Sequence, residues 1–249
     1  MQRLAICLVL KLLSFGICIT SHWLSATEVK IIHNHELPSV ATLQNILEQV
    51  ISPDKPKTGK IKAIIIFDND GVLFPMGGSN PENLDQTMAE TLAKLKKEPG
   101  VAVGVVTNRH SKYAAKDLKT FKAEFGGLNL LPGTSQNYKS GCVFKQGAFY
   151  VNKVFSKGQA MKKILQMLKK RGRLDANSTL VFIDDSPGNL DPVIEECRDM
   201  GLKEIFAMHY IASWKAAFSV KIGEFFTLPM LLIRKLTSWL PYSLQPRMI

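Results

Sequence analysis

The sequence has 249 residues, of which 46% are hydrophobic and 21% charged, and its formal net charge is +11. This length suits one sizeable α/β domain rather than two full domains, and the composition is that of a globular chain rather than a disordered one. The positive charge favours anionic ligands and surfaces. Because the lysines are scattered along the chain, the positive charge does not predict specific binding to nucleic acid.

Residues 1–26 have the layout of a secretory signal peptide. Arg3 gives a positive start, the next stretch is almost entirely apolar and is broken once by Lys11, and small residues close it at Ser25–Ala26. We therefore predict cleavage after Ala26 and export, to the periplasm or out of the cell. Loss of Arg3 and Lys11 would leave a mature charge of +9. The alternative is an uncleaved membrane anchor, although Lys11 makes this run a poor membrane span.

Two of the four cysteines, Cys7 and Cys18, fall in the predicted leader. The mature chain would keep Cys142 and Cys197, and an oxidising compartment would allow them to pair. The sequence leaves open whether these two form a disulfide or stay as buried thiols.

Residues 27–60 are predicted to form one short helix and a linker. Ser39 is suited to cap a helix that ends near Val50. The stretch 52–60 contains two prolines, a glycine and several lysines, which is typical of a loop.

Residues 61–215 alternate between apolar strands and amphipathic helices, which predicts an α/β domain. Such alternation favours a mostly parallel central sheet with helices on both faces, in three layers. A hairpin of 143–144 and 148–151 is expected within a small insert at about 126–155. The other expected strands are 61–67, 101–106, 180–183 and 204–208, and the expected helices are 83–97, 111–125, 158–170 and 190–200.

Polar residues follow three of the predicted strands directly. Asp68 and Asp70 follow the first, Thr107-Asn108-Arg109 the second, and Asp184-Asp185 the third, while Lys157 opens a helix. Ligands of open α/β sheets bind beyond the carboxyl ends of the strands, so these side chains are expected to share one rim. Any one aspartate after a strand is as well explained as a turn or helix cap.

Four acids at one rim resist ionising together unless positive charge balances them. A divalent cation with oxygen ligands removes that cost, and Lys157 adds a second positive charge. Acids, a metal, a hydroxyl and a lysine form the inventory that phosphoryl transfer requires.

In this order the motifs resemble those of the haloacid dehalogenase (HAD) superfamily. Phe67 to Leu73 is similar to its Asp-x-Asp-Gly motif, Thr107 to its second motif, Lys157 to its third, and Asp184-Asp185 to its fourth. The resemblance covers residues 61 to about 210 and implies a Rossmann-like HAD fold with a small cap insert. More narrowly, the stretch from Gly147 to Tyr210 resembles a poorly characterised family of exported bacterial HAD-like proteins.

The resemblance also implies a role for each residue. Asp68 would be the nucleophile and Asp70 the proton donor and acceptor. Thr107, Asn108 and Lys157 would bind the phosphoryl group. Mg²⁺ would be bound by Asp68, by the backbone carbonyl of Asp70, and by Asp184 and Asp185, with either of the last two as the direct ligand. Arg109 fits both a grip on a substrate phosphate and an exposed residue at a helix start.

Residues 216–249 form an apolar tail with basic residues, typical of an amphipathic helix. Packing on the core and weak contact with a membrane surface both fit this pattern, and its apolar stretch, residues 225–240, is too short to span a bilayer.

The function expected from these features is an exported Mg²⁺-dependent phosphatase acting on small phosphomonoesters. A HAD-fold binding protein with little catalysis, and a phosphotransferase with the same residues, remain as alternatives. The patterns indicate neither a monomer nor an oligomer.

Overall fold

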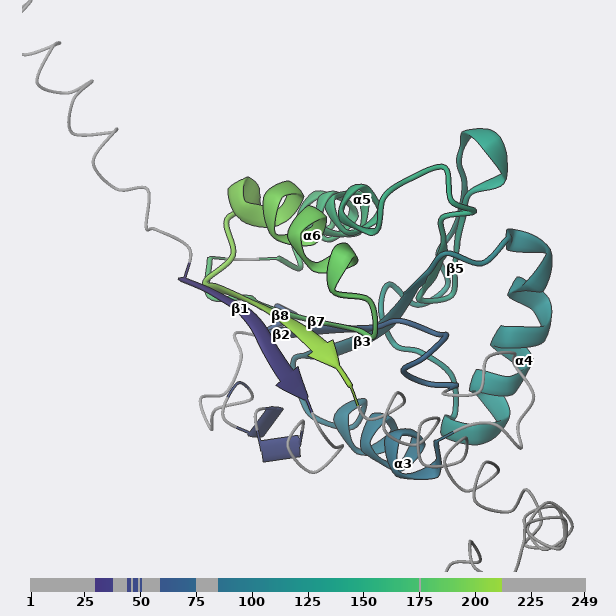
Figure 1. Cartoon of the computed structure of the whole chain (residues 1–249), viewed down its shortest axis with the longest axis horizontal. Coiled ribbons are helices and arrows are strands. Elements are labelled where there is room, and N and C mark those ends of the chain that lie inside the picture. Colours follow the sequence, from purple (N-terminus) through teal and green to yellow (C-terminus); the bar gives the residue numbers. More distant parts are fainter. Residues whose placement is uncertain are drawn as a thin grey trace, which may run out of the picture.

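The computed structural model describes residues 30–37, 44–45, 47–48, 50, 59–74, 85–174 and 176–211. The predicted leader (1–26), most of the predicted linker and the predicted tail (216–249) lie outside these residues. Figure 1 shows a central sheet with helices above and below it. The mixed α/β class with a mostly parallel sheet is therefore confirmed, and it is consistent with a Rossmann-like HAD fold.

Eight strands build the sheet within the described ranges: β1 Lys30–Leu37, β2 Ala63–Phe67, β3 Val101–Thr107, β4 Ser135–Asn137, β5 Val143–Lys145, β6 Ala148–Tyr150, β7 Thr179–Asp184 and β8 Glu204–Tyr210. Their order is β1-β8-β7-β2-β3-β6-β5-β4. Neighbours from β1 through β6 are parallel, and β5 and β4 continue the sheet in antiparallel fashion. The expected insert at 126–155 thus contributes three strands to one edge of the sheet.

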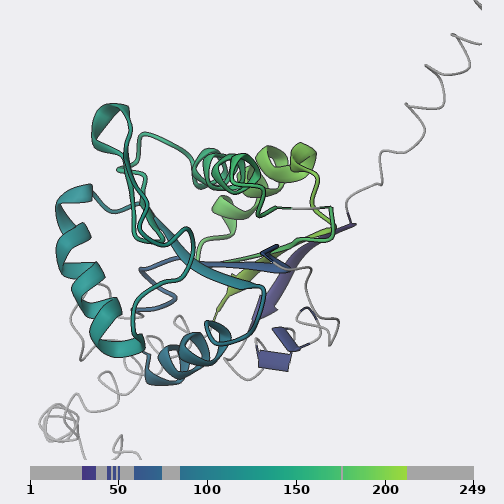
Figure 2. The ribbon, with the colours of Figure 1, turned by 180° about the vertical axis from the view of Figure 1, so that it is seen from behind.

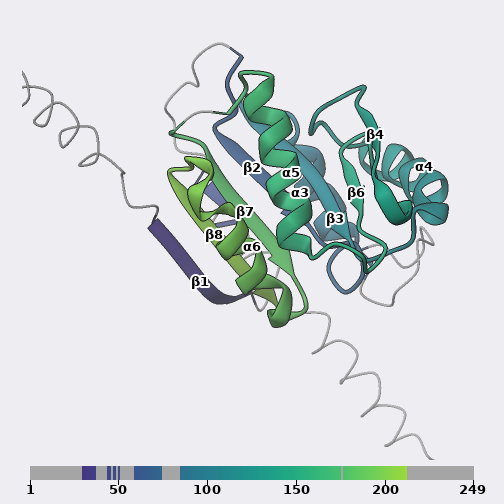
Figure 3. The same cartoon turned by 90° about the horizontal axis from the view of Figure 1, so that it is seen from above.

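Helices cover both faces of the sheet, as Figures 2 and 3 show from behind and from above. On one face lie α3 (Gln86–Leu95) and α4 (Ala114–Phe125), and on the other α5 (Lys157–Lys170) and α6 (Leu190–Cys197). Short 3₁₀ turns accompany them at η2 Ser111–Tyr113, η3 Lys139–Gly141, η4 Pro187–Asn189 and η5 Arg198–Met200. No helix among the described residues has the length and apolar character needed to cross a membrane.

The two cores on either side of the sheet explain why β2 is apolar throughout. Successive side chains of a strand point to opposite faces. Ile65 and Phe67 belong to the core beneath α3 and α4, whereas Ile64 and Ile66 belong to the core beneath α5 and α6. Each of these side chains is fully buried, as expected for a central strand of a parallel sheet.

Two strands were not predicted, for different physical reasons. β1 lies in the segment expected to hold only a helix and a linker, and it pairs in parallel with β8. Its stability depends on a partner far along the chain, which a local pattern cannot reveal. β4 has the polar sequence Ser-Gln-Asn and is exposed throughout, so it carries no hydrophobic signal. The expected helix near Val50 is supported by five described helical residues, Gln44, Asn45, Leu47, Glu48 and Val50.

The two cysteines of the predicted mature chain are free and buried. Cys142 packs in the core beneath α5, and its Sγ donates to the carbonyl of Val151 over 3.0 Å. Cys197 closes α6 in the same core. Of the two possibilities that the sequence left open, the structure therefore shows two buried thiols rather than a disulfide.

The start of α5 is set by a capping box and by close packing against α6. Ser156 is the N-cap of the helix and exchanges hydrogen bonds with Gln159. Gly158 then brings the two helices together, since a Cβ at this position would lie 2.0 Å from the carbonyl oxygen of Pro192. This contact places Lys157 at the rim of the sheet.

Gly158→Ala is expected to lower the free energy of unfolding by about 1–3 kcal/mol, because the added methyl group forces α5 away from α6. Gly188→Ala is the matched control, since nothing lies within 4 Å of a Cβ at that position. Urea unfolding of both variants measures the difference. Equal stability of the two would contradict the close contact.

Candidate active site

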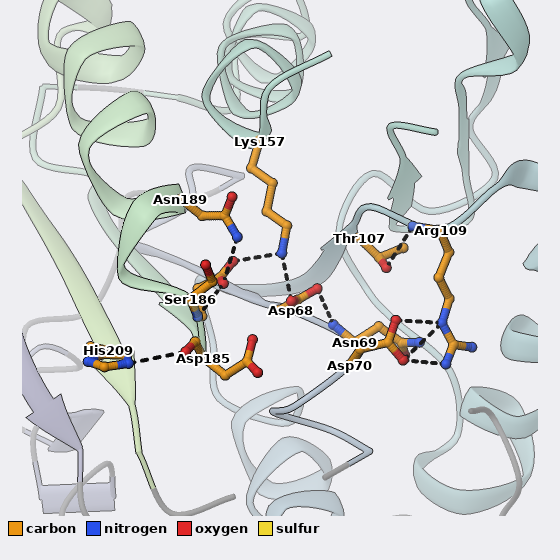
Figure 4. Close-up of polar contacts among 11 residues, drawn as sticks. Asp68, Asn69, Asp70, Thr107, Arg109, Lys157, Asp185, Ser186, Asn189 and His209 are labelled. Carbon is orange, nitrogen blue, oxygen red and sulfur yellow. Dashed lines mark hydrogen bonds and ion pairs between the residues drawn. The ribbon is translucent and has the colours of Figure 1, made fainter. Parts of the chain in front are cut away.

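The candidate site lies where β2, β3 and β7 end, as the strand-end argument predicted. β2 pairs with β3 on one side and with β7 on the other, so the residues following these strands converge. Figure 4 shows the acids, Lys157 and Thr107 meeting at this edge.

A buried lysine joins the first and last of the predicted motifs. Lys157 Nζ lies 2.6 Å from Asp68 Oδ2 and 2.7 Å from Asp184 Oδ2. The lysine is 2% exposed, Asp68 6% and Asp184 0%, so water screens these charges little. Three residues from separate elements thus form one buried ionic cluster.

The rest of this cluster is fixed by short loops. Asp68 Oδ1 accepts from the backbone N–H of Asn69 over 2.7 Å. Asp184 Oδ1 accepts from the N–H of Ser186 and from Asn189 Nδ2, each over 2.9 Å. Ser186 and Asn189 therefore orient Asp184.

Gly71 allows Asp185 to approach the loop after β2. Its φ is +80°, and a Cβ there would lie 1.9 Å from Asp185 Oδ2. The glycine of the Asp-x-Asp-Gly motif is thus required by both its backbone conformation and the space it leaves. On the other side, His209 Nε2 lies 3.1 Å from the carbonyl oxygen of Asp185.

Burial dominates the protonation of the cluster. It raises the pKa of Asp68 from 3.8 to about 7, with Lys157 opposing and Asp184 adding to the increase. Burial also lowers the pKa of Lys157, but the carboxylates of Asp68 and Asp184 outweigh it and leave that pKa raised. The pKa of Asp185 is raised by burial and by the charge of Asp184. Full ionisation of all three acids around a single lysine is therefore disfavoured.

The donor set fits a hard divalent cation such as Mg²⁺. Carboxylate oxygens of Asp68, Asp184 and Asp185 lie within 4.8 Å of one another. With all three acids ionised and Lys157 protonated, two negative charges remain, which a divalent ion would neutralise. The carboxylate of Asp70 is outside this group, and its backbone carbonyl stays a predicted ligand.

Mg²⁺ is expected to stabilise the fold more at about pH 8 than at about pH 5.5. In the folded protein the pKa of Asp68 is raised from 3.8 to about 7. Without metal, its contribution to stability is therefore fully present below pH 3.8 and is lost as the pH rises toward 7. Metal binds the ionised form, so its stabilisation grows over the same interval and reaches about 2.7 kcal/mol at roughly 100 times Kd.

Thermal unfolding with Mg²⁺ or EDTA measures this effect, with Asp184→Asn as the variant that should lose it. A Tm shift that is independent of pH would contradict the raised pKa of Asp68, and a shift that persists in Asp184→Asn would contradict the metal assignment.

The predicted phosphate-binding residues border the cluster. Thr107 ends β3, is 1% exposed, and its Oγ1 accepts from the N–H of Arg109 over 3.2 Å. Asn108 is exposed at the rim. Lys157 lies on the side of the site formed by α5 (Figure 4).

Arg109 contacts two neighbouring acids, and its predicted grip on a substrate phosphate stays a prediction. Its Nε donates to Asp70 Oδ1 over 3.1 Å and to Oδ2 over 2.8 Å, and its Nη2 also pairs with Asp70 Oδ1. Its Nη1 donates to Asp117 Oδ1 over 3.0 Å. The side chain is 12% exposed, so the interpretation as an exposed residue at a helix start is wrong.

Asp117 was missed by the sequence reasoning, although a signal was present. It lies three residues after Ala114 and four before Phe121, on the inward face of α4, where a fully buried acid is rare without a partner. Burial raises the pKa of the nearby Tyr150 phenol, and the charge of Asp117 raises it further.

Comparison with known proteins identifies a family without a described activity. A family model described as a protein of unknown function (DUF2608) matches residues 80–224, more than half of the chain. The chain belongs to this family. In this DUF2608 member the matched region includes Thr107, Lys157 and Asp184-Asp185, and it begins after Asp68 and Asp70. No curated protein matches the sequence.

Two solved structures are similar at low identity. The HAD domain of the effector protein Lem4 from Legionella pneumophila, an inactive mutant, is 12% identical, with 71% of this chain and 99% of that chain covered and a TM-score of 0.37. A chain of the Pnkp1/Rnl/Hen1 RNA repair complex is 16% identical, with 69% of this chain and 54% of that chain covered and a TM-score of 0.32. Likeness at this level assigns neither a substrate nor an activity.

Proposed function

We propose that the chain is an exported, Mg²⁺-dependent phosphatase of the HAD type that hydrolyses small phosphomonoesters through an aspartyl-phosphate at Asp68. One observation carries the proposal: Lys157 Nζ lies within 2.7 Å of both Asp68 and Asp184, beside Asp185, at the carboxyl ends of parallel strands. Export is proposed from the signal-peptide pattern of residues 1–26.

Asp68 is suited to attack phosphorus. Its carboxylate oxygen forms a bond to phosphorus while the bond from phosphorus to the ester oxygen breaks, and Asp70 gives its proton to that leaving oxygen. In the second step Asp70 takes a proton from water, the water oxygen bonds to phosphorus, and the bond between Asp68 and phosphorus breaks. Inorganic phosphate leaves, and both aspartates return to their starting forms.

Lys157 and Thr107 are placed to hold the phosphoryl oxygens. The lysine ammonium has three N–H donors, and the contacts to Asp68 and Asp184 use two of them. The third and the Thr107 hydroxyl would bind oxygens of the substrate. Mg²⁺ held by Asp68, Asp184 and Asp185 would neutralise charge on the transferring group.

The test is release of inorganic phosphate by the purified mature chain from a panel of phosphate esters. Turnover is expected with Mg²⁺, and EDTA should lower it by about two orders of magnitude or more, because the buried acids then repel the incoming phosphate. Unchanged rates in EDTA would contradict the metal role. No turnover on a wide panel would favour the binding protein, and phosphate transfer to an added alcohol in place of release would favour the phosphotransferase.

A further inference from the structure

A second, partly buried ionic cluster lies beside the first, and two of its members, Arg109 and Asp117, have no role in the proposed chemistry. Arg109 engages both oxygens of Asp70 from one side of its guanidinium and Asp117 from the other. Asn69 is the third neighbour of the guanidinium. In the amide orientation that gives both its oxygen and its nitrogen suitable partners, the Asn69 oxygen accepts from Arg109 Nε over 2.9 Å and from Nη1 over 3.1 Å. Figure 4 shows the guanidinium facing Asp70 and Asn69.

Burial divides this cluster into a fixed part and a reacting part. Asp117 is fully buried in the first turn of α4, and the Arg109 side chain is 12% exposed. The Asp70 side chain, in contrast, is 46% exposed. A short carboxylate at that exposure would sample several rotamers if nothing held it. The planar guanidinium of Arg109 is therefore held by the buried Asp117 and in turn binds the more exposed Asp70.

We propose that Arg109 and Asp117 are positioning residues for Asp70: Asp117 fixes the guanidinium, and the guanidinium fixes the orientation of the Asp70 carboxyl group toward the leaving oxygen. The inference rests on the proposed function, because Arg109 and Asp117 can act as positioning residues only if Asp70 transfers a proton. The inference depends on the two-pronged geometry of the guanidinium as well as on its charge. A lysine at this position would keep the positive charge but could not bind both oxygens of a carboxylate in one plane.

This arrangement predicts a dependence on the leaving group. The value of kcat/KM reports the steps up to phosphoenzyme formation, in which Asp70 protonates the ester oxygen. An alkyl phosphate needs that proton, whereas p-nitrophenyl phosphate has a stable leaving anion and needs it little. Misplacing a general acid therefore slows the alkyl ester selectively. A loss of stability alone would slow both esters alike.

The experiment compares Asp117→Asn, Arg109→Lys and Asp70→Asn on these two esters in the presence of Mg²⁺. Asp117→Asn and Arg109→Lys are expected to lower kcat/KM for the alkyl ester by ~10-fold or more, and for p-nitrophenyl phosphate by less than ~3-fold. Asp70→Asn should show the same selectivity with a larger loss. Arg109→Lys provides the test if Asp117→Asn fails to fold.

Phe125→Leu is the matched control, since it loosens the far end of the same helix, where Phe125 stacks on Phe121. Equal losses on both esters in Asp117→Asn and Arg109→Lys, of the size seen in Phe125→Leu at matched Tm, would overturn the inference, as would no loss at all. If Asp70→Asn itself shows no selectivity, the failure lies instead in the proposed role of Asp70.

Discussion

Asp68→Asn is expected to abolish phosphatase turnover while leaving the protein folded. The amide has the shape of the carboxylate but is too weak a nucleophile to form the phosphoenzyme, so kcat should fall by roughly a thousandfold or more. Stability should not fall at about pH 8 in EDTA, because burial favours the neutral form of this side chain and asparagine is neutral. The raised pKa of about 7 at Asp68 is the basis of that expectation.

The comparison uses steady-state rates and thermal unfolding, with Asp199→Asn as a control at an exposed acid. The control should match the native chain in both measurements. Activity within tenfold of the native chain in Asp68→Asn would exclude this residue as the nucleophile.

Lys157→Met is expected to lower kcat by about a hundredfold and also to destabilise the protein. The change removes the positive partner of two buried acids, and breaking a buried pair in this way typically costs about 3–5 kcal/mol. Without the ammonium, the pKa of Asp68 rises further, so in EDTA the stability loss should grow as the pH rises and ionisation is forced. Mg²⁺ should restore part of the stability but little of the rate, since it cannot replace the N–H donor to the phosphoryl group.

The control for this variant is Lys169→Met, an exposed lysine on the same helix. Chemical unfolding at about pH 6 and about pH 8 separates the two effects. A stability loss that does not change with pH would show that packing, rather than charge pairing, is what Lys157 provides.

Much of the site was predictable because parallel strands deliver their following residues to a common edge. Asp68, Thr107 and Asp184 each follow an apolar run that the sequence marks clearly, and Lys157 follows a recognisable N-cap. Once those strands are neighbours, the juxtaposition of these four residues follows from topology. Their chemistry then depends on residue types that are visible in the sequence.

The second cluster was not predictable in the same way. Arg109 follows a strand as Thr107 does, but the direction of a long side chain depends on which partners surround it. Its partner Asp117 lies on a helix, and only the packing of α4 against the sheet brings the two together. β1 shows the same limit for the fold, because its pairing with β8 joins segments about 170 residues apart, a separation that local periodicity does not encode.

The central claim is that Asp68 becomes phosphorylated during turnover. The direct measurement is to quench the working enzyme in acid, reduce it with borohydride, which converts an aspartyl-phosphate to homoserine, and map the product by peptide mass spectrometry. The account predicts homoserine at position 68, formed only when both a phosphate ester and Mg²⁺ are present, and absent in Asp68→Asn. Homoserine at another aspartate, or brisk phosphate release with Asp68 never converted, would contradict it.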